Sequence, residues 1–256
     1  MKTLGFIGTG AITAAFIEGL VAGGHRNPIL VSPRSEHLSE ALAARFETVS
    51  RAASNAEVTR DSDIVFLAIR PAQVEEALRG IEFRPGQIVC SFVTGLPVPE
   101  LEAIAPTATV CRVLPLPAIA IRKGPVIHYP RVPEILDLIE GMGDVVVPAT
   151  EADLVAMGGV SGFMSSFLDL QAALAGWLEG RGVAPEAANL YTRSIFSGLS
   201  ETALRSPKTL AELAGEHETK GGLNERTRNY LAGRNWFAEP GLALDAVQQL
   251  SRTQLK

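Results

Sequence analysis

The first half of the chain alternates short apolar runs with segments in which apolar residues recur at helical spacing. Apolar runs bounded by turn residues predict buried strands, and they cover residues 3–8, 29–32, 48–50, 63–69, 87–92 and 108–114. One intervening helix begins at "SNAE", a capping box in which Ser54 caps the helix and Glu57 reaches back to its amide. Strands that alternate with helices predict a parallel sheet with helices on both faces. A tail made of "GPVIHY", "PEILDLIEGMG" and "DVVVP" is expected to extend that sheet.

The pattern changes near Ala149, because the strand signals stop there. From Glu151 onward the sequence predicts one long helical segment, bent around the glycines at 158, 159 and 162, and then three or four further helices. We therefore expect two domains, an α/β domain over 1–149 and an all-helical domain over 150–256.

Composition excludes several classes of function. A net charge of −5 argues against a nucleic-acid partner, which usually needs a basic face. No apolar run is long enough to span a membrane, and the glycines of the opening residues argue against a secretory signal, so we expect a cytoplasmic protein. Cys90 and Cys111 lie in apolar runs and are expected to be buried free thiols. No metal-ligand spacing is present, so no metal is expected.

The first motif with chemical meaning is "GFIGTGAIT", which follows the first strand and opens the first helix. Gly8 suits the tight turn, and Gly10 lets a pyrophosphate approach the backbone beside the positive end of the helix. Ala11 and Ile12 begin that helix and belong to the same expected site. Thr13 stands where the GxGxxG pattern has its third small residue. In this context the motif predicts a Rossmann dinucleotide site, although glycines in a nucleotide-free α/β domain could also simply make a turn.

The residues after the second strand indicate which cofactor is bound. An NAD site usually has an acidic residue there for the ribose hydroxyls. This chain has Ser32 and Arg34, and the first acid is Glu36. An arginine can pair with a 2′-phosphate, so NADPH is favoured over NADH. The alternative for Arg34 is a solvated loop charge.

The chain resembles the pyrroline-5-carboxylate reductase family along nearly its whole length. The resemblance rests on "GFIGTGAITAAFIEGL", "AIRPAQV" at 68–74, "RVLP" at 112–115, the helical second half and "TKGGLNE". It implies an N-terminal Rossmann domain that binds NADPH, followed by an all-helical dimerisation and substrate-binding domain. It also assigns Ala68, Arg70, Pro71 and Pro115 to the cofactor.

The regions that the resemblance places nearest the substrate depart most from the family pattern. Leu116 replaces an amide side chain, Phe163 replaces a proline, and Lys220 replaces another proline. Leu223 and Asn224 replace two threonines. These departures suggest a divergent branch, for which another cyclic or acyclic imine is an alternative substrate.

"HETKGGLNE" interrupts the helical half with a bare, polar backbone. Gly221 and Gly222 precede a predicted helix, whose N-terminal N–H groups can bind a substrate carboxylate. We expect Leu223 and Asn224 to contact the substrate, and a β-branched residue at Gly222 to block the carboxylate and resist positive φ. Three basic residues are expected to add positive charge near the loop, namely Lys220, Arg226 and Arg228. His217 and Glu218 are expected to be solvated. The alternative is a simple helix break.

The resemblance implies reduction of pyrroline-5-carboxylate to proline by hydride transfer to the imine carbon, in a homodimer in which the glycine loop of one subunit completes the partner's site. Asn224 is the catalytic candidate, and the proton donor is left open between Asn224, Ser161, Ser165 and water. His128 and Tyr191 are expected to be structural, Tyr191 within the core. Two alternatives remain: another NADP oxidoreductase, such as one using deazaflavin, and a non-catalytic NADP-binding regulatory dimer.

Overall fold

The computed structural model describes residues 2–254 of the chain. It divides into two compact units, Met1–Gly158 (unit 1) and Gly159–Lys256 (unit 2). The division falls inside a helix, α7 (Glu151–Val160). The boundary predicted at 149/150 stays a prediction.

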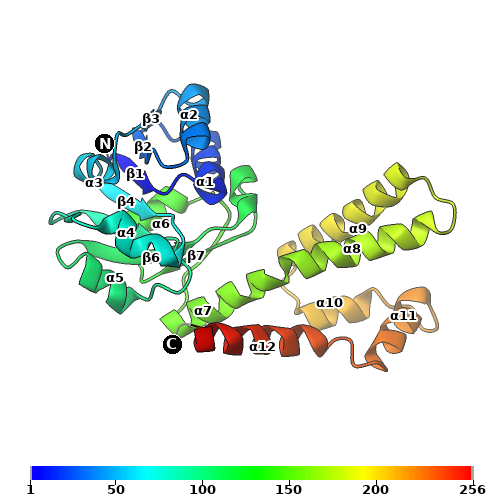
Figure 1. The fold of residues 1–256 in the computed structure, drawn as a ribbon. Coiled ribbons are helices and arrows are strands. Elements are labelled where there is room, and N and C mark those ends of the chain that lie inside the picture. Colours follow the sequence, from blue (N-terminus) through cyan, green and yellow to red (C-terminus); the bar gives the residue numbers. More distant parts are fainter. Residues whose placement is uncertain (1, 255–256) are drawn as a thin grey trace. The chain divides into compact units, whose positions relative to one another are not determined.

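Unit 1 contains one eight-stranded sheet (Figure 1), in the order β3-β2-β1-β4-β5-β6-β7-β8. The six predicted main strands are confirmed to within two residues at each end, and the predicted tail adds two more strands. The strands are β1 (Leu4–Ile7), β2 (Ile29–Val31), β3 (Val49–Arg51), β4 (Ile64–Leu67), β5 (Ile88–Ser91), β6 (Thr109–Leu114), β7 (Pro125–Tyr129) and β8 (Asp144–Val146).

Helices cover both faces of this sheet, as the alternation predicted. The elements of unit 1 are α1 (Ala11–Ala22), α2 (Glu36–Arg45), α3 (Asn55–Asp61), η1 (Pro71–Gln73), α4 (Val74–Leu78), α5 (Val98–Ile104), η2 (Pro117–Ile121) and α6 (Pro133–Ile139). The capping box at α3 is confirmed in part. Ser54 Oγ accepts from Glu57 N (3.1 Å), but the Glu57 carboxylate accepts from Ala53 N (2.7 Å) rather than from the amide of Ser54.

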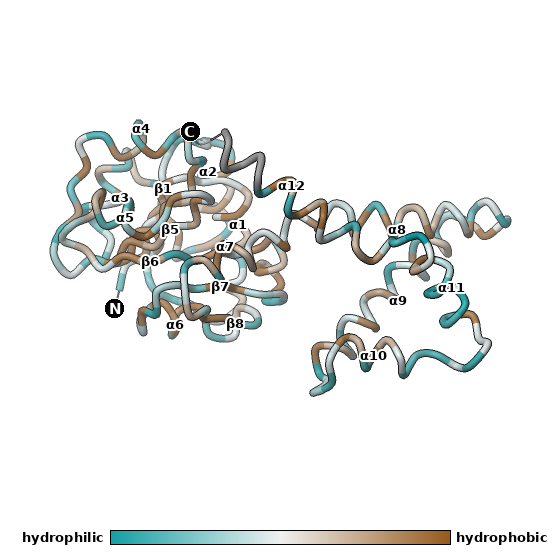
Figure 2. Tube along the Cα trace, turned by 90° about the horizontal axis from the view of Figure 1, so that it is seen from below, coloured by the Kyte–Doolittle hydropathy of each residue, from teal (hydrophilic) through white to brown (hydrophobic). Residues whose placement is uncertain are grey.

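Alternate residues of the strands build two separate apolar layers. Phe66 belongs to the layer shared with α1, α2, η2 and α6, whereas its neighbours Val65 and Leu67 face α3, α4 and α5. Four phenylalanine rings meet in the first layer with centroids 4.7–6.5 Å apart, namely Phe6, Phe16, Phe66 and Phe92. The apolar stretches of Figure 2 run along β1, β5 and β6 within this unit.

β7 and β8 run opposite to the other six strands, which corrects the expectation of a wholly parallel sheet. β7 pairs with β6 in the antiparallel sense, with His128 opposite Val113. The segment 115–124 between these strands contains only the short helix η2. A parallel crossover needs about a dozen or more residues, usually an α-helix, so this connection is too short to return the chain in the parallel direction.

Unit 2 is helical throughout the part that the structure describes. The first long segment is interrupted by a 3₁₀ turn, η3 (Ser161–Phe163), between α7 and the next helix, and the predicted bend stays a prediction. The remaining helices are α8 (Met164–Glu179), α9 (Pro185–Arg205), α10 (Leu210–Glu216), α11 (Leu223–Ala232) and α12 (Glu239–Gln254). The predicted fold class, an α/β Rossmann domain followed by helices, is therefore confirmed.

Unit 2 buries very little of its apolar surface within one chain. Among the described side chains of 159–248, only Ala175, Ala188 and Thr192 are buried. Tyr191 was expected in the core, but it is 62% exposed. Helical periodicity identifies an apolar face without showing what covers it, which is why that expectation was wrong.

Candidate functional site

The carboxyl ends of β1 and β4 mark the point where the strand order of unit 1 reverses. In open α/β sheets, ligands bind in the crevice at such a point. Gly8 follows β1 and lies directly against the residue after β4, because a Cβ on Gly8 would be 2.3 Å from Ala68 O. The structure therefore brings together the two predicted cofactor segments, 8–12 and 68–71.

Internal hydrogen bonds fix the conformation of the glycine turn. Gly8 has φ +103°, a conformation that side chains rarely adopt. Its N–H donates to Ser32 Oγ (2.9 Å), and Thr13 Oγ1 donates to its carbonyl oxygen (2.6 Å). Thr9 Oγ1 donates to Ser32 O (2.7 Å). Thr13, the departure from the third glycine, therefore stabilises the turn with its hydroxyl.

Gly10 leaves open space in front of the helix. It is the N-cap of α1 and no side chain caps that helix end, while a Cβ on Gly10 would have no atom within 4 Å. Ala11 is exposed and Ile12 is partly buried at the first turn. Uncapped N–H groups at the positive end of a helix, facing an open approach, fit a pyrophosphate group.

Ser32 and Arg34 take different positions after β2. Ser32 is 1% exposed, and its hydroxyl accepts from Gly8, so in this structure it supports the turn. The side chain of Arg34 is 55% exposed, and its Nη1 lies 3.9 Å from Glu76 Oε2. Such an exposed, long ion pair holds a guanidinium weakly, so the Arg34 side chain can turn toward an anionic ligand.

The remaining cofactor candidates follow β4 and β6. Arg70 and Pro71 are exposed at the start of η1, and the Arg70 N–H donates to Gln73 Oε1 (3.2 Å). Pro115 is buried directly after β6, and Leu116 beside it is partly buried. Parallel strands present their carboxyl ends at one edge of a sheet, so these segments share the edge that carries the glycine turn.

A buried ion pair that the sequence did not indicate supports the end of β6. Arg112 is 3% exposed, and its Nη1 donates to Glu151 Oε1 at 2.7 Å. The same oxygen accepts from Val98 N (2.9 Å), so it ties β6 and α5 to the start of α7. The sequence motif "RVLP" marked Arg112 but gave no sign of the ion pair, because Glu151 lies 39 residues away in the chain.

His128 is structural, as predicted. Its Nε2 accepts from Val132 N (2.9 Å), and its Nδ1 lies 3.2 Å from Arg112 O. A carbonyl oxygen only accepts, so Nδ1 carries the proton and both ring nitrogens are used. Cys90 and Cys111 are free and buried, also as predicted.

The glycine loop of unit 2 corrects one expectation about backbone conformation. Gly221 has φ +73°, whereas Gly222, the N-cap of α11, has φ −77° and ψ 173°. The positive φ predicted for Gly222 therefore belongs to Gly221. A Cβ on Gly222 would lie 2.8 Å from Thr219 O, so a side chain there disturbs the turn itself.

The side chain of Asn224 is held in one orientation by the loop. Its Nδ2 donates to His217 O (2.8 Å). Because a carbonyl cannot donate, this contact fixes which end of the amide is nitrogen. The Asn224 Oδ1 therefore faces away from that carbonyl and serves as an acceptor.

Asn224 also lines an apolar cavity that lies wholly within unit 2. The cavity has a volume of about 380 Å³ and is lined by Ile195, Leu199, Thr202, Ala203, Leu210, Leu213, Ala214, His217 and Asn224. His217 Nδ1 lies 2.8 Å from Leu213 O and donates to it, so the ring is anchored. His217 is exposed, as expected, and it also lines this cavity. Ser161 and Ser165 are not among the lining residues.

The charge expected around the loop is partly cancelled. Glu218 was expected to be solvated, but its side chain is only 15% exposed and pairs with Arg228 through both oxygens. Hydrogen bonds from Arg228 lower the pKa of the Glu218 carboxyl below its usual value. Arg228 therefore adds little net positive charge, which corrects the prediction made for it.

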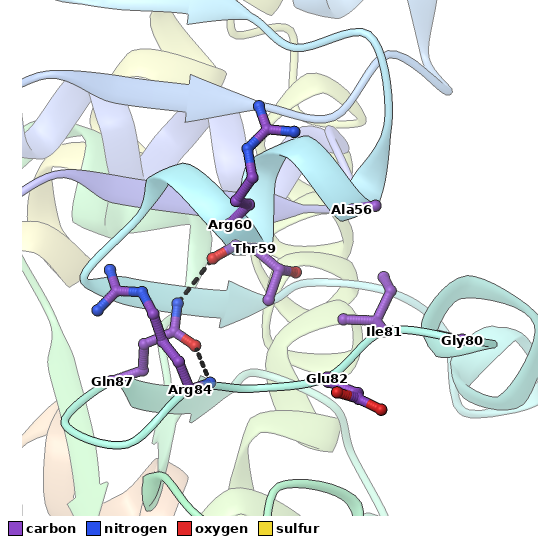
Figure 3. A pocket seen from close by; sticks show the side chains of 8 residues that line it. All are labelled: Ala56, Thr59, Arg60, Gly80, Ile81, Glu82, Arg84 and Gln87. Atoms are coloured by element: carbon purple, nitrogen blue, oxygen red, sulfur yellow. Dashed lines mark hydrogen bonds between the residues drawn. The ribbon is translucent and has the colours of Figure 1, made fainter.

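A second cavity, of about 220 Å³, lies at the other edge of the sheet in unit 1 (Figure 3). Gln87 precedes β5, so the cavity is beside the amino ends of the strands. Gln87 Oε1 accepts from Arg84 N (2.7 Å), and its Nε2 donates to Thr59 O (2.7 Å). Arg84 and Arg60 are paired with Asp63 and Asp61. Because Gln87 and both arginines are engaged within the chain, these side chains are not free to bind a ligand in the cavity.

Among residues 2–254, no cluster of His, Cys, Asp or Glu is placed to hold a metal ion. No described helix combines the length and the apolar character that crossing a bilayer requires.

The chain is similar to known proteins over the length of both units. Residues 3–95 match a family described as NADP oxidoreductase coenzyme F420-dependent. Over 260 residues the chain is 26% identical to a pyrroline-5-carboxylate reductase of Pseudomonas aeruginosa, covering 97% of this chain and 95% of that protein.

Two solved structures share the fold. A pyrroline-5-carboxylate reductase from Coxiella burnetii is 22% identical with a TM-score of 0.85, and 98% of each chain is covered. The Plasmodium falciparum pyrroline carboxylate reductase with NADP bound is 18% identical with a TM-score of 0.83, covering 98% of this chain and 97% of that one. Together, these matches include the helical unit as well as the sheet.

Proposed function

We propose that this chain, which belongs to the pyrroline-5-carboxylate reductase family, is an NADPH-dependent enzyme that reduces pyrroline-5-carboxylate to proline. The observation that carries the proposal is the glycine turn at the reversal point of the sheet, in a chain whose full-length relatives are named for this reaction. The turn has an uncapped helix N-terminus and open space at Gly10. The reaction would belong to proline biosynthesis, and we expect it in the cytoplasm.

The residues of unit 1 fit the cofactor that the family implies. Gly8, Gly10 and the first turn of α1 would hold the pyrophosphate, and Arg34 would pair with the 2′-phosphate. When bound, NADPH supplies the hydride that the imine carbon accepts. Arg70, Pro71 and Pro115, at the same edge of the sheet, would line the rest of the cofactor.

Unit 2 would supply the contacts to the substrate. A protonated imine is already a good electrophile, so the protein has mainly to position it. Asn224 Oδ1 is an acceptor, which suits the N–H of a protonated imine. The product amine keeps that proton, so hydride transfer itself needs no separate acid. The N–H groups at the start of α11 would take the carboxylate.

We also propose that the enzyme is a homodimer or a higher homo-oligomer. Large apolar side chains of unit 2 are exposed in the single chain, among them Leu168, Leu190, Leu204 and Leu210 at 62–76%. Monomeric proteins rarely leave such extended apolar surfaces uncovered, and a second copy of the same surface is the commonest partner.

The proposal is tested by following NADPH oxidation with purified protein and a panel of cyclic imines, starting with pyrroline-5-carboxylate and piperideine-2-carboxylate. Turnover of pyrroline-5-carboxylate with proline as product is the expected result. A second candidate is an NADP oxidoreductase with a different redox partner, which the match of residues 3–95 favours. Tight NADPH binding without turnover of any imine would instead favour the non-catalytic regulator.

A further inference from the structure

We propose that Glu225 is a specificity-determining residue of this enzyme, whose carboxylate competes with the substrate carboxylate for the glycine loop. Its effect would be to weaken the preference for imines that carry a carboxylate over imines that lack one. This inference rests on the proposed imine reduction.

The position of Glu225 supports this role. It is the third residue of α11, and its Oε2 accepts from Gly221 N at 2.5 Å. The N–H of Gly221, which the positive φ of this residue orients, is thus occupied by a carboxylate of the chain itself. A substrate carboxylate that approaches the same helix end must displace this group or share the site with it.

The preceding helix provides an internal comparison. Glu212 is the third residue of α10, and its carboxylate accepts from Thr209 N (2.7 Å). There the N-cap residue Thr209 also caps with its hydroxyl, so Glu212 completes an ordinary capping box. Gly222, the N-cap of α11, has no side chain to do so. Glu225 instead accepts from the N–H of Gly221, the residue before the N-cap.

Arg228 interacts electrostatically with Glu225, but its guanidinium is already paired with another carboxylate, that of Glu218. Two carboxylates within hydrogen-bonding distance of one backbone site repel each other and do not both remain ionised there without cost. Binding of a substrate carboxylate at the loop is therefore weakened as long as the Glu225 carboxylate keeps its hydrogen bond to Gly221 N.

The other exposed groups of the loop favour a less polar substrate. Leu223, at the first position of α11, is 82% exposed and presents an isobutyl group where the resemblance expects a threonine hydroxyl. The cavity that Asn224 lines is mostly apolar. These surfaces can contact an imine ring without requiring any acidic substituent.

The experiment compares two substrates that differ only in the carboxylate, pyrroline-5-carboxylate and 1-pyrroline, with the full-length enzyme and saturating NADPH. Glu225→Gln retains an oxygen that can accept from Gly221 N but removes the charge. We expect kcat/KM for pyrroline-5-carboxylate to rise about tenfold, the factor that corresponds to ~1.4 kcal/mol, with the value for 1-pyrroline unchanged. Glu212→Gln is the matched control and should alter neither substrate.

The outcomes separate this inference from the proposed function. An equal change for both substrates, or no change for either, would overturn the role of Glu225 while leaving imine reduction intact. If the wild-type chain reduces neither imine, the proposed function fails. The inference is then judged by calorimetric titration of the NADP⁺-loaded protein with L-proline and pyrrolidine. Glu225→Gln must then bind L-proline about tenfold more tightly, with pyrrolidine unchanged, or the inference is wrong.

Discussion

The two units differ in how they treat apolar side chains. In unit 1 the strands bury both faces under helices, and residues such as Phe6, Phe16 and Phe66 are 0% exposed. In unit 2 the helices leave Leu190 at 71% and Leu210 at 76% exposed. Unit 1 therefore has a complete core of its own. Unit 2 of a single chain leaves large apolar side chains uncovered.

The largest expected effect comes from the core of unit 1. Phe66→Ala removes a ring at the centre of the four-phenylalanine cluster and should lower the free energy of unfolding by about 3–5 kcal/mol. Urea unfolding followed by circular dichroism measures this change. Ile121→Ala, at a residue that is 74% exposed in the same unit, is the control and should stay within about 0.5 kcal/mol. A loss below about 1 kcal/mol for Phe66→Ala would show that the cluster is not tightly packed.

The second expected effect tests whether the exposed face of unit 2 is covered by a second copy. Leu190→Asp places a charge within an apolar contact and should weaken self-association at least about a thousandfold, near 4 kcal/mol. Sedimentation equilibrium gives the dissociation constant directly. Ile121→Asp introduces the same charge at an exposed apolar residue of unit 1 and should leave the assembly unchanged. Equal effects of the two substitutions on self-association would show that the exposed face of unit 2 is not the surface that a second copy covers.

The third effect concerns the chemistry assigned to unit 2. Asn224→Leu keeps similar bulk but removes the acceptor, so kcat should fall tenfold to a thousandfold, about 1.4–4 kcal/mol, with a smaller change in KM. Asn224→Thr restores the residue of the family pattern and should retain most activity with pyrroline-5-carboxylate. Steady-state kinetics, with a check that each variant still assembles, distinguishes these results. Full activity of Asn224→Leu would show that Asn224 has no catalytic role. His217, which lines the same cavity, would then be the next candidate to test.

The same contrast explains which parts of the fold could be predicted from the sequence. Buried strands between helices produce runs that are apolar throughout, so the six main strands were located closely. The direction of β7 depends on the length of the preceding connection, and an apolar run does not encode it. Tyr191 was assigned to a core because a helix repeats its apolar residues whether they face the chain itself or another molecule.

The site could be predicted only where neighbouring residues determine it. Gly8 and Gly10 act through local backbone geometry, and the sequence identified their turn. The partners of Arg112 and Arg228 lie 39 and 10 residues away, so their charge balance required the folded chain. The sequence marked both loop glycines, but only the structure distinguished Gly221, with its positive φ, from Gly222.

The smallest expected effect concerns the cofactor preference of unit 1. Arg34→Ala should weaken NADPH binding by about 1–3 kcal/mol, because one charge-assisted contact to the 2′-phosphate is lost. NADH lacks that phosphate, so its affinity should hardly change. Glu76→Gln removes the carboxylate that lies 3.9 Å from Arg34, and it should strengthen NADPH binding only about twofold, since exposed pairs contribute little. Fluorescence titration of both cofactors against the three proteins gives all of these values. Equal losses for NADPH and NADH in Arg34→Ala would show that Arg34 does not read the phosphate, and the NADPH preference would then have to come from other residues of unit 1.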